Sequence, residues 1–415
     1  MESASELDPR RFSGARPPVM VLGGLNISRA RGLAGIPVIV ASSAAHEVAF
    51  ASRYCSGRLR LPSHEGRGAM ADSLLAAGKR LAGSLGRRLP LFYCNDDWQR
   101  LVQDYRSELA PHYSLLLNDS DVAGAVIEKD LFQPLAAARG LPVPRTLDWD
   151  RLERIEGPVL VKPRTKFDWN ASPVYLRLFR RQGKARIFSS GRELLADAAA
   201  RQLRDELLIQ EYVAGDDRQI WSFHGFSDEN GRLLDWFIGR KIRTYPALTG
   251  MSTYLELAHD DELAALGRGI AAAMPLKGVF KIDLKRDPRI GRFRVLEVNA
   301  RYNLWHYLGA ANGVNLPRTA YEYLVYGKRP AASRGYRTTH RWIYLRYDWH
   351  AYRQLASRGE LGLPAWLASL AAAPKVCQLF GWSDPLPFLN KLYHLVKSRL
   401  PRLTHVLRRW LSTAS

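Results

Sequence analysis

Apolar and polar side chains alternate in the run LEVNAR, residues 296–301, as they do in a β-strand with one buried face. Successive side chains of a β-strand point to opposite faces, so Glu297, Asn299 and Arg301 share one face and the apolar residues between them share the other. The apolar face predicts contact with a core. The polar face fits either an ordinary solvent-facing surface or a set of functional side chains, and the strand alone leaves both open.

A second strand precedes this one, because GVFKIDLKRD and FRVLEVNAR are separated only by a short turn. Antiparallel pairing of the two would bring the carboxylate of Asp283 beside that of Glu297. Two carboxylates and the amide oxygen of Asn299 make a set of hard oxygen donors. Such a set suits Mg²⁺, which also keeps water and phosphate oxygens around it.

Bulk properties narrow the classes of protein that remain. A chain of 415 residues predicts two or three domains, and 47% hydrophobic with 24% charged residues is typical of a folded protein. The formal charge of +21 favours anionic partners such as nucleotides, phosphates, nucleic acid or an acidic membrane surface.

The cysteines and the N-terminus indicate a compartment. Cys55, Cys94 and Cys377 are far apart and form no CxxC pair, which fits a reducing cytoplasm and gives no sign of a zinc site or a disulfide framework. The chain begins without a signal-peptide pattern and contains no apolar run long enough to span a bilayer. We therefore expect a cytoplasmic protein that is soluble or peripheral at the inner face of the membrane.

Strand and helix patterns alternate in the first 120 residues. The runs PVMVLGGLN, IPVIVAS and LPLFYC predict buried strands of a parallel α/β sheet, with Asn95 or Asp96 as the N-cap of a helix after the third. Gly23 and Gly24 lack the rest of the GxGxxG fingerprint, so a structural turn is favoured over a dinucleotide site.

The chain then changes character. A capped helix carries Lys129, and the run GPVLVKP predicts a strand that Lys162 interrupts. Either lysine alone would fit an ordinary surface position, although Lys162 lies in an otherwise buried pattern. The run ELLIQEYVAGDD predicts a strand that leads into a turn with two acids, and a β-hairpin follows it.

The order of these pieces over residues 121–327 resembles the ATP-grasp superfamily. The fold that this resemblance implies is α/β and α+β: an N-terminal parallel α/β (pre-ATP-grasp) domain, a two-lobed ATP-grasp domain, and a basic helical C-terminal region. The corresponding ranges are 1–120, 121–330 with lobes about 121–205 and 206–330, and 331–415.

The resemblance implies roles for six residues in holding ATP. Two lysines would contact the phosphates, backbone groups around three residues would hold adenine, and an aspartate would accept hydrogen bonds from the ribose hydroxyls. In that order they are Lys129 and Lys162; Gln210, Glu211 and Val213; and Asp217.

The resemblance also implies a catalytic centre. Asp283, Glu297 and Asn299 would hold Mg²⁺ or Mn²⁺, with two ions expected, and Arg301 would stabilise the transferring phosphate and the acyl-phosphate. Independently of the resemblance, Lys241 on the predicted hairpin is a further candidate for a catalytic cation.

Three runs resemble carboxylate–amine ligases of the D-aspartate ligase type: FQPLAAARGLPVPRT, GRKIRTYP and NARYNLWHYLGAANGVNLP. In such enzymes ATP phosphorylates a carboxylate, and an amine displaces the phosphate to form an amide. The segment RTKFDWNASPVY after Lys162 has no glycine-rich flap like that of biotin carboxylases, which argues against a carboxylase. The alternatives are a non-catalytic ATP-grasp scaffold and a basic nucleic-acid-binding protein, the latter without any recognisable binding motif.

Other residues keep two interpretations. Arg240, Lys241 and Arg243 would meet an anionic substrate or the γ-phosphate, or they form a solvated strand edge. Trp305 and His306 would line the acceptor pocket, or they pack in the core.

The C-terminal end is a separate feature. The run PFLNKLYHLVKSRL has a helical amphipathic spacing, and no acidic residue follows residue 388. This end would pack on the body or attach to an anionic bilayer. The expected partners are small carboxylate and amine substrates, with a homodimer as the expected oligomer and nucleic acid not expected.

Overall fold

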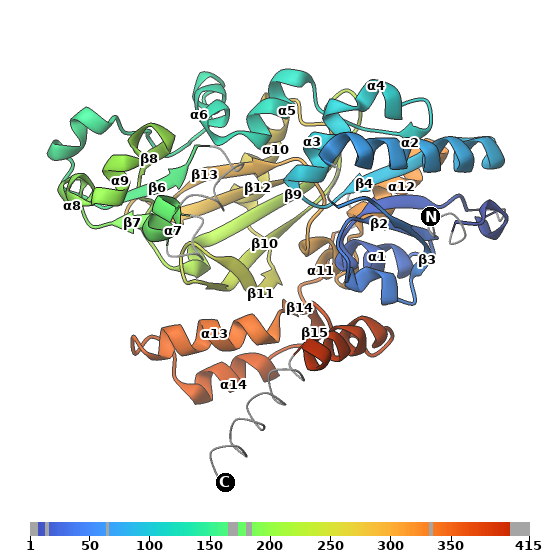
Figure 1. Cartoon of the computed structure of the whole chain (residues 1–415). Coiled ribbons are helices and arrows are strands. Elements are labelled where there is room, and N and C mark those ends of the chain that lie inside the picture. The colour runs from blue at the N-terminus through green and yellow to red at the C-terminus, as the bar shows by residue number, and fades with distance from the viewer. Residues whose placement is uncertain are drawn as a thin grey trace, which may run out of the picture.

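The structure is a computed structural model, and the predicted mixed α/β architecture is confirmed in it (Figure 1). A parallel sheet, a small antiparallel sheet and a large, mainly antiparallel sheet make up the molecule. The structure describes residues 7–12, 16–63, 66–164, 173–179, 185–331 and 335–398, without the side chains of residues 129 and 173.

The N-terminal sheet is parallel and has the strand order β3-β2-β1-β4-β5. Its central strands are buried along their whole length, as expected for a parallel sheet with covered faces. The strands are β1 (Val19–Leu22), β2 (Val38–Ser42), β3 (Cys55–Arg60), β4 (Leu89–Tyr93) and β5 (Tyr113–Ser114). The helices are α1 (Leu25–Gly32), α2 (Gly66–Leu85), α3 (Asp96–Asp104) and α4 (Arg106–Leu109).

Local sequence explains how α3 begins. The side chain of Asn95 accepts a hydrogen bond from the backbone N–H of Trp98 at 2.8 Å, so Asn95 is the N-cap that the sequence predicted as one of two candidates. This cap leaves Asp96 in the first helical turn, at the carboxyl end of β4.

A three-stranded antiparallel sheet with the order β7-β6-β8 forms the second body. Its strands are β6 (Val159–Pro163), β7 (Arg186–Phe188) and β8 (Leu207–Glu211). Its helices are α7 (Pro173–Phe179), α8 (Gly191–Ala196) and α9 (Ala198–Gln202), and the connecting helices α5 (Ser120–Ile127) and α6 (Lys129–Ala138) precede it. We expected the boundary between the two lobes near residue 205. In the structure β8 still pairs with β6, so the chain leaves the small sheet only after Glu211.

The large sheet has seven strands in the order β13-β12-β9-β10-β11-β14-β15. They are β9 (Ile220–Ser227), β10 (Leu233–Tyr245), β11 (Met251–Leu257), β12 (Gly278–Asp287), β13 (Arg292–Asn299), β14 (Arg341–Ile343) and β15 (Lys375–Cys377). The expected β9–β10 hairpin and the expected β12–β13 pair are both antiparallel, as predicted. The helices that follow these strands are α10 (Asp261–Ala273), α11 (Trp305–Ala311) and α12 (Leu316–Tyr326).

One face of this sheet is apolar. Phe223, Phe280 and Ile282 are fully buried and pack with Leu263 and Ile270 of α10 in one continuous core. Because side chains alternate along a strand, the opposite face of β9, β12 and β13 is left to the polar residues.

The C-terminal region is helical, as predicted, and it also adds β14 and β15 to the large sheet. Its helices are α13 (Leu345–Ala356), α14 (Leu363–Ala371) and the helix at 386–398, which lie together at one end of the molecule (Figure 1). Among the helices in the described ranges, none is long and apolar enough to cross a membrane.

Candidate active site

The strand register gathers the predicted metal ligands on one face of the large sheet. Asp283 of β12 lies opposite Glu297 of β13, so the predicted pairing is confirmed, and Lys281 lies opposite Asn299. On the other side of β12, Asp283 lies opposite Ser222 of β9. We call these five residues the polar floor.

Asp283 is held from two sides. The hydroxyl of Ser222 donates a hydrogen bond to Oδ1 at 2.6 Å, and the ammonium of Lys281 lies 2.5 Å from Oδ2. The side chain of Asp283 is buried, and a buried carboxylate is stable only with such partners. The lysine shows that this position accepts a positive charge.

A chain of hydrogen bonds orders the rest of the floor. Arg301 donates to Oδ1 of Asn299 at 3.0 Å, and the amide of Asn299 donates to Oε1 of Glu297 at 3.2 Å. Arg301 also forms an ion pair with Asp96 of the N-terminal sheet, at 2.7 Å from Nε to Oδ1. Burial alone would lower the pKa of Arg301, but Asp96 and the two floor carboxylates raise it above its ordinary value.

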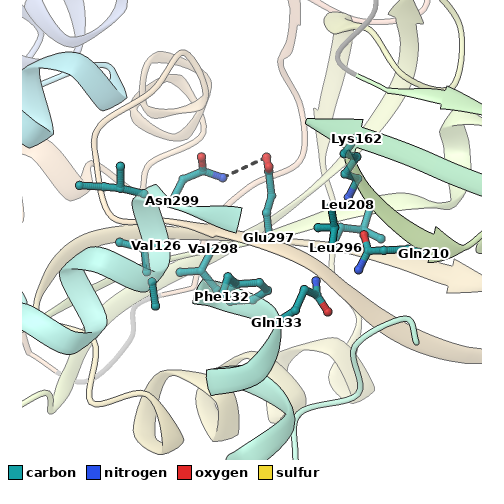
Figure 2. Close-up of a pocket in the computed structure, with 12 residues that line it drawn as sticks. Val126, Phe132, Gln133, Lys162, Leu208, Gln210, Leu296, Glu297, Val298 and Asn299 are labelled. Carbon is teal, nitrogen blue, oxygen red and sulfur yellow. Dashed lines mark hydrogen bonds between the residues drawn. The ribbon is translucent and has the colours of Figure 1, made fainter. Parts of the chain in front are cut away.

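Lys162 approaches the floor from the small sheet. It projects from β6 into a pocket whose opposite wall carries Glu297 and Asn299 of β13 (Figure 2). Burial lowers the pKa of Lys162, and the carboxylates of Glu297 and Asp283 partly restore it. Two lobes that are far apart in sequence therefore bring a lysine and two carboxylates to one place.

The same pocket has an apolar part with two buried amides. Phe132, Leu208 and Leu296 line it (Figure 2). Within the described part of the chain, neither side-chain polar atom of Gln210 has a hydrogen-bond partner, and the Oε1 atom of Gln133 has none. A buried amide without a partner costs free energy, so these two side chains suit a flat polar ligand that supplies donors and acceptors.

Of the six predicted ATP contacts, only Lys162 and Gln210 line this pocket among the residues that the structure describes. Glu211 forms an ion pair with Arg145 at 2.8 Å, and Val213 is buried just after it. Lys129 is the first residue of α6, but its side chain lies outside the described residues. The segment 165–172, which the sequence distinguished from a glycine-rich flap, also lies outside them.

Asp217, the predicted ribose ligand, is engaged with the chain itself. Its carboxylate accepts hydrogen bonds from the backbone N–H and hydroxyl of Thr244, at 2.7 and 2.8 Å, and from the N–H of Leu248 at 2.8 Å. These contacts fix the turn after β10. A carboxylate has about four acceptor positions, so a ribose contact stays a prediction.

The three basic residues of β10 have different roles. Arg240 pairs with Glu256, and Arg243 is buried in an ion pair with Asp348 of α13, with Nε and Oδ1 2.8 Å apart. Arg243 therefore connects the sheet to a helix. Lys241 projects from the floor face, because Gly239 lies opposite Ser222 and Lys241 is two residues further along.

Trp305 and His306 are packed in the core. Trp305 lies so close to Gly239 that a Cβ there would come 2.2 Å from the indole ring. His306 is fully buried, and its Nδ1 lies 3.0 Å from the N–H of Asn303. Burial lowers the pKa of His306 to about 4. These contacts favour the packing interpretation.

Several functional candidates were missed from the sequence, among them Lys281, Lys285, Ser222 and Gln133. Burial lowers the pKa of Lys285 to about 8, and the carboxylate of Asp217 opposes this shift most strongly. The sequence did contain a signal for the two lysines. Lys281, Asp283 and Lys285 occupy every second position of their strand, as Glu297, Asn299 and Arg301 do in theirs.

The floor also fits the ligand preferences of Mg²⁺. Asp283, Glu297 and Asn299 offer oxygen donors on adjacent strands, and the ammonium of Lys281 already lies against one of them. No group of three or more His, Cys, Asp or Glu side chains is placed to hold a metal among the residues that the structure describes. A metal would thus need the amide oxygen of Asn299, water and phosphate oxygens to complete its shell.

A small sheet carries a lysine that faces carboxylates on a large sheet, which is the arrangement expected from the resemblance of the sequence to ATP-grasp enzymes. A D-aspartate ligase from Enterococcus faecium (strain Aus0004) is 22% identical over 273 residues. The match spans 62% of this chain and 63% of that protein, which is less than two thirds of the relative's length. No protein-family model matches the chain.

Solved structures share the fold. The L-amino acid ligase from Bacillus licheniformis gives a TM-score of 0.54 at 14% identity, over 75% of this chain and 74% of that one. The biotin carboxylase domain dimer of the 2-oxoglutarate carboxylase of Hydrogenobacter thermophilus, in complex with MgADP, ADP and bicarbonate, gives 0.56 at 14% identity, over 78% and 73%. The resemblance of this chain to ATP-grasp carboxylate–amine ligases is therefore confirmed.

Proposed function

We propose that the protein is an ATP-dependent ligase that activates a carboxylate as an acyl-phosphate and joins it to an amine. The observation that carries this proposal is the meeting of Lys162 with Glu297 and Asp283 across the pocket between the two sheets. A cation on one side and oxygen donors on the other suit a polyphosphate that bridges them through Mg²⁺.

ATP would lie with its base in the apolar part of the pocket. The side chains of Gln210 and Gln133 would pair with the polar edge of the purine, while Leu208 and Leu296 would contact its faces. Glu211 and Val213 would contribute backbone groups nearby, and Asp217 would meet the ribose. Lys162 and Lys129 would hold the phosphates.

Asp283, Glu297 and Asn299 would hold Mg²⁺, or Mn²⁺ in its place. The ion would supply charge neutralisation at the β- and γ-phosphate oxygens. Arg301, which Asp96 holds in position, and Lys241, on the same face of the sheet, would stabilise negative charge on the phosphoryl group as it moves.

The reaction would have two steps. A carboxylate oxygen attacks the γ-phosphorus and the bond to the bridging oxygen of ADP breaks, which leaves an acyl-phosphate. The amine nitrogen then attacks the carbonyl carbon, the bond from that carbon to the phosphate oxygen breaks, and the amine proton passes to solvent. The products are an amide, ADP and phosphate.

The test is isotopic. Purified protein, ATP and Mg²⁺ are incubated with amines and with ¹⁸O-labelled carboxylates, a panel that includes D-aspartate, L-amino acids, dipeptides and sugar acids. We expect ADP release with a productive pair only, and one ¹⁸O atom transferred to each phosphate.

Two results would contradict the proposal. Protein that binds MgATP but releases no ADP across the panel would support a non-catalytic scaffold, and amide formation without ¹⁸O in the phosphate would exclude the acyl-phosphate. Salt-dependent binding of nucleic acid without nucleotide affinity would favour the basic binding protein instead.

We place this reaction in the cytoplasm, where ATP is available. We also propose that the protein is a homodimer. Light scattering coupled to gel filtration measures the oligomeric state directly. A monomeric mass at micromolar concentration would remove the dimer and leave the reaction untouched.

A further inference from the structure

The helix at 386–398 presents its apolar side to solvent. Leu386, Leu389, Tyr393 and Val396 recur at the spacing that places side chains on one side of a helix, and Leu392 lies beside them. All five are between 44% and 59% exposed. A surface helix of a globular protein normally buries this side.

Contacts with the body keep the helix in this orientation. On its other side, Pro387 is buried and the ring of His394 stacks on His46 of the N-terminal domain at 4.0 Å. Just before the helix, the buried carboxylate of Asp384 pairs with Arg29 of α1 at 2.9 Å. The polar side therefore rests on the protein, and the apolar side stays available.

The exposed side is large enough to require an explanation. Each fully buried leucine is worth about 1.5–3 kcal/mol relative to an exposed one, so a contiguous row in water forgoes substantial free energy. Single exposed apolar residues are common, whereas contiguous patches mark interaction sites. Trp382, which is 92% exposed, adds an aromatic ring close to the start of the helix, and such rings favour the interface between lipid and water.

The charge around this apolar side is positive. Lys391 and Lys397 are exposed, and the helix carries no acidic residue. The sequence of residues 399–415, whose structure lies outside the described range, adds four arginines and no acid. Lys397 follows Tyr393 by four residues and so lies beside the apolar side, whereas Lys391 lies on the side of Pro387 and His394. A lysine beside an apolar helical face extends along it and keeps its ammonium group in the headgroup region.

We propose that the apolar side of helix 386–398, together with Trp382 and the exposed Lys391 and Lys397, docks this protein on an anionic lipid bilayer. In its described range the helix is shorter than the run of about 20 apolar residues that a bilayer span needs, and it carries two lysines, so we place it in the plane of the surface. Because this surface is separate from the ATP pocket, the inference does not depend on the ligase reaction.

The experiment is co-sedimentation of the full chain with vesicles of phosphatidylcholine alone and of phosphatidylcholine with 30% phosphatidylglycerol. We expect binding to the anionic vesicles and little to the neutral ones, with a decrease at high salt. The triple variant Leu389→Ser, Leu392→Ser, Val396→Ser should bind at least tenfold less tightly. Lys391→Gln with Lys397→Gln should weaken binding by about fivefold for each lysine.

The matched control is Leu33→Ser with Ile290→Ser, which changes two apolar side chains of similar exposure elsewhere. It should bind as the unchanged protein does, and all variants should keep the same thermal midpoint. Equal binding to neutral and anionic vesicles, or full binding by the triple variant, would overturn the proposal. A dimer that the triple variant converts to a monomer, without vesicle binding by either, would assign the surface to a second copy of the chain.

Discussion

Glu297 has two kinds of neighbour, and both connect it to the proposed reaction. It accepts a hydrogen bond from Asn299 within the floor, and its charge opposes the lowering of the pKa of Lys162 that burial causes. Removing its charge would weaken the proposed metal site and leave the lysine without one of its counter-charges. A change at one residue of the polar floor is therefore expected to affect its neighbours as well.

The first prediction concerns this carboxylate. In Glu297→Gln, we expect ADP release with a productive substrate pair to fall by about 100-fold or more, because the variant removes the carboxylate that we propose as a ligand of Mg²⁺ at the transferring phosphoryl group. Glu262→Gln, on the exposed surface of α10, is the matched control and should keep full activity. Unchanged activity in the Glu297 variant would contradict the assignment.

The second prediction concerns Lys285, whose pKa burial lowers to about 8 in the folded protein against 10.5 for an ordinary lysine. Between pH 8 and pH 10.5 the unfolded chain binds more protons at this residue than the folded chain does, so stability rises with pH there. Between pH 7 and pH 10, the free energy of unfolding should rise relative to Lys285→Met by roughly 2 kcal/mol.

Denaturant unfolding at both pH values measures this difference, and comparison with the variant cancels the titration of all other groups. Lys328→Met, at an exposed position, should show no such difference. Parallel pH profiles of the unchanged protein and Lys285→Met would contradict the prediction.

At the scale of elements, β10 and α13 depend on one buried ion pair. Arg243 donates to both oxygens of Asp348, and Asp348 also accepts hydrogen bonds from Thr253 and from the indole of Trp366. Burying a charged pair gains little by itself, but removing one member leaves the other without a partner.

The third prediction follows from this geometry. Arg243→Met should lower the free energy of unfolding by about 3–5 kcal/mol, because the carboxylate of Asp348 stays buried and loses its counter-charge. Arg243→Met with Asp348→Leu should recover part of that loss. Denaturant unfolding of the two variants measures both free energies of unfolding. If Arg243→Met were as stable as the unchanged protein, the ion pair would contribute nothing to stability.

The sequence predicted some contacts between elements and failed to predict others. The β12–β13 pair and its polar face were predicted because period-two alternation and a short turn are local signals. The partners of Asp217 and Arg243 were not, since they lie 27 to 105 residues away and depend on tertiary packing. For the same reason, the sequence could not distinguish Arg243, which is buried in an ion pair, from Lys241, which projects from the face of the sheet that carries the polar floor.

At the scale of the whole molecule, the two ends of the chain are tied together. The carboxylate of Asp384 accepts hydrogen bonds from Arg29, from the hydroxyl of Ser52 and from the backbone N–H of Arg53. The outer strands β14 and β15 also join the large sheet from this region. No local pattern indicates the contacts of Asp384, because they join residues more than 300 positions apart.

The fourth prediction tests this connection. Asp384→Ala should cost about 3–5 kcal/mol of stability, because Arg29 would stay buried without its partner. Limited proteolysis should then cut near residues 378–398 faster than in the unchanged protein. Asp205→Ala, at an exposed site in the small lobe, is the control, and equal cleavage rates in all three proteins would contradict the role of Asp384.

A crystal structure with a non-hydrolysable ATP analogue and Mg²⁺ would show whether the pocket between the small and large sheets holds both, as we propose. We predict a metal within about 2.1 Å of oxygens of Asp283, Glu297 or Asn299, with the phosphates reaching Lys162 and the base between Leu208 and Leu296. A nucleotide bound elsewhere, or a metal away from the polar floor, would contradict the account.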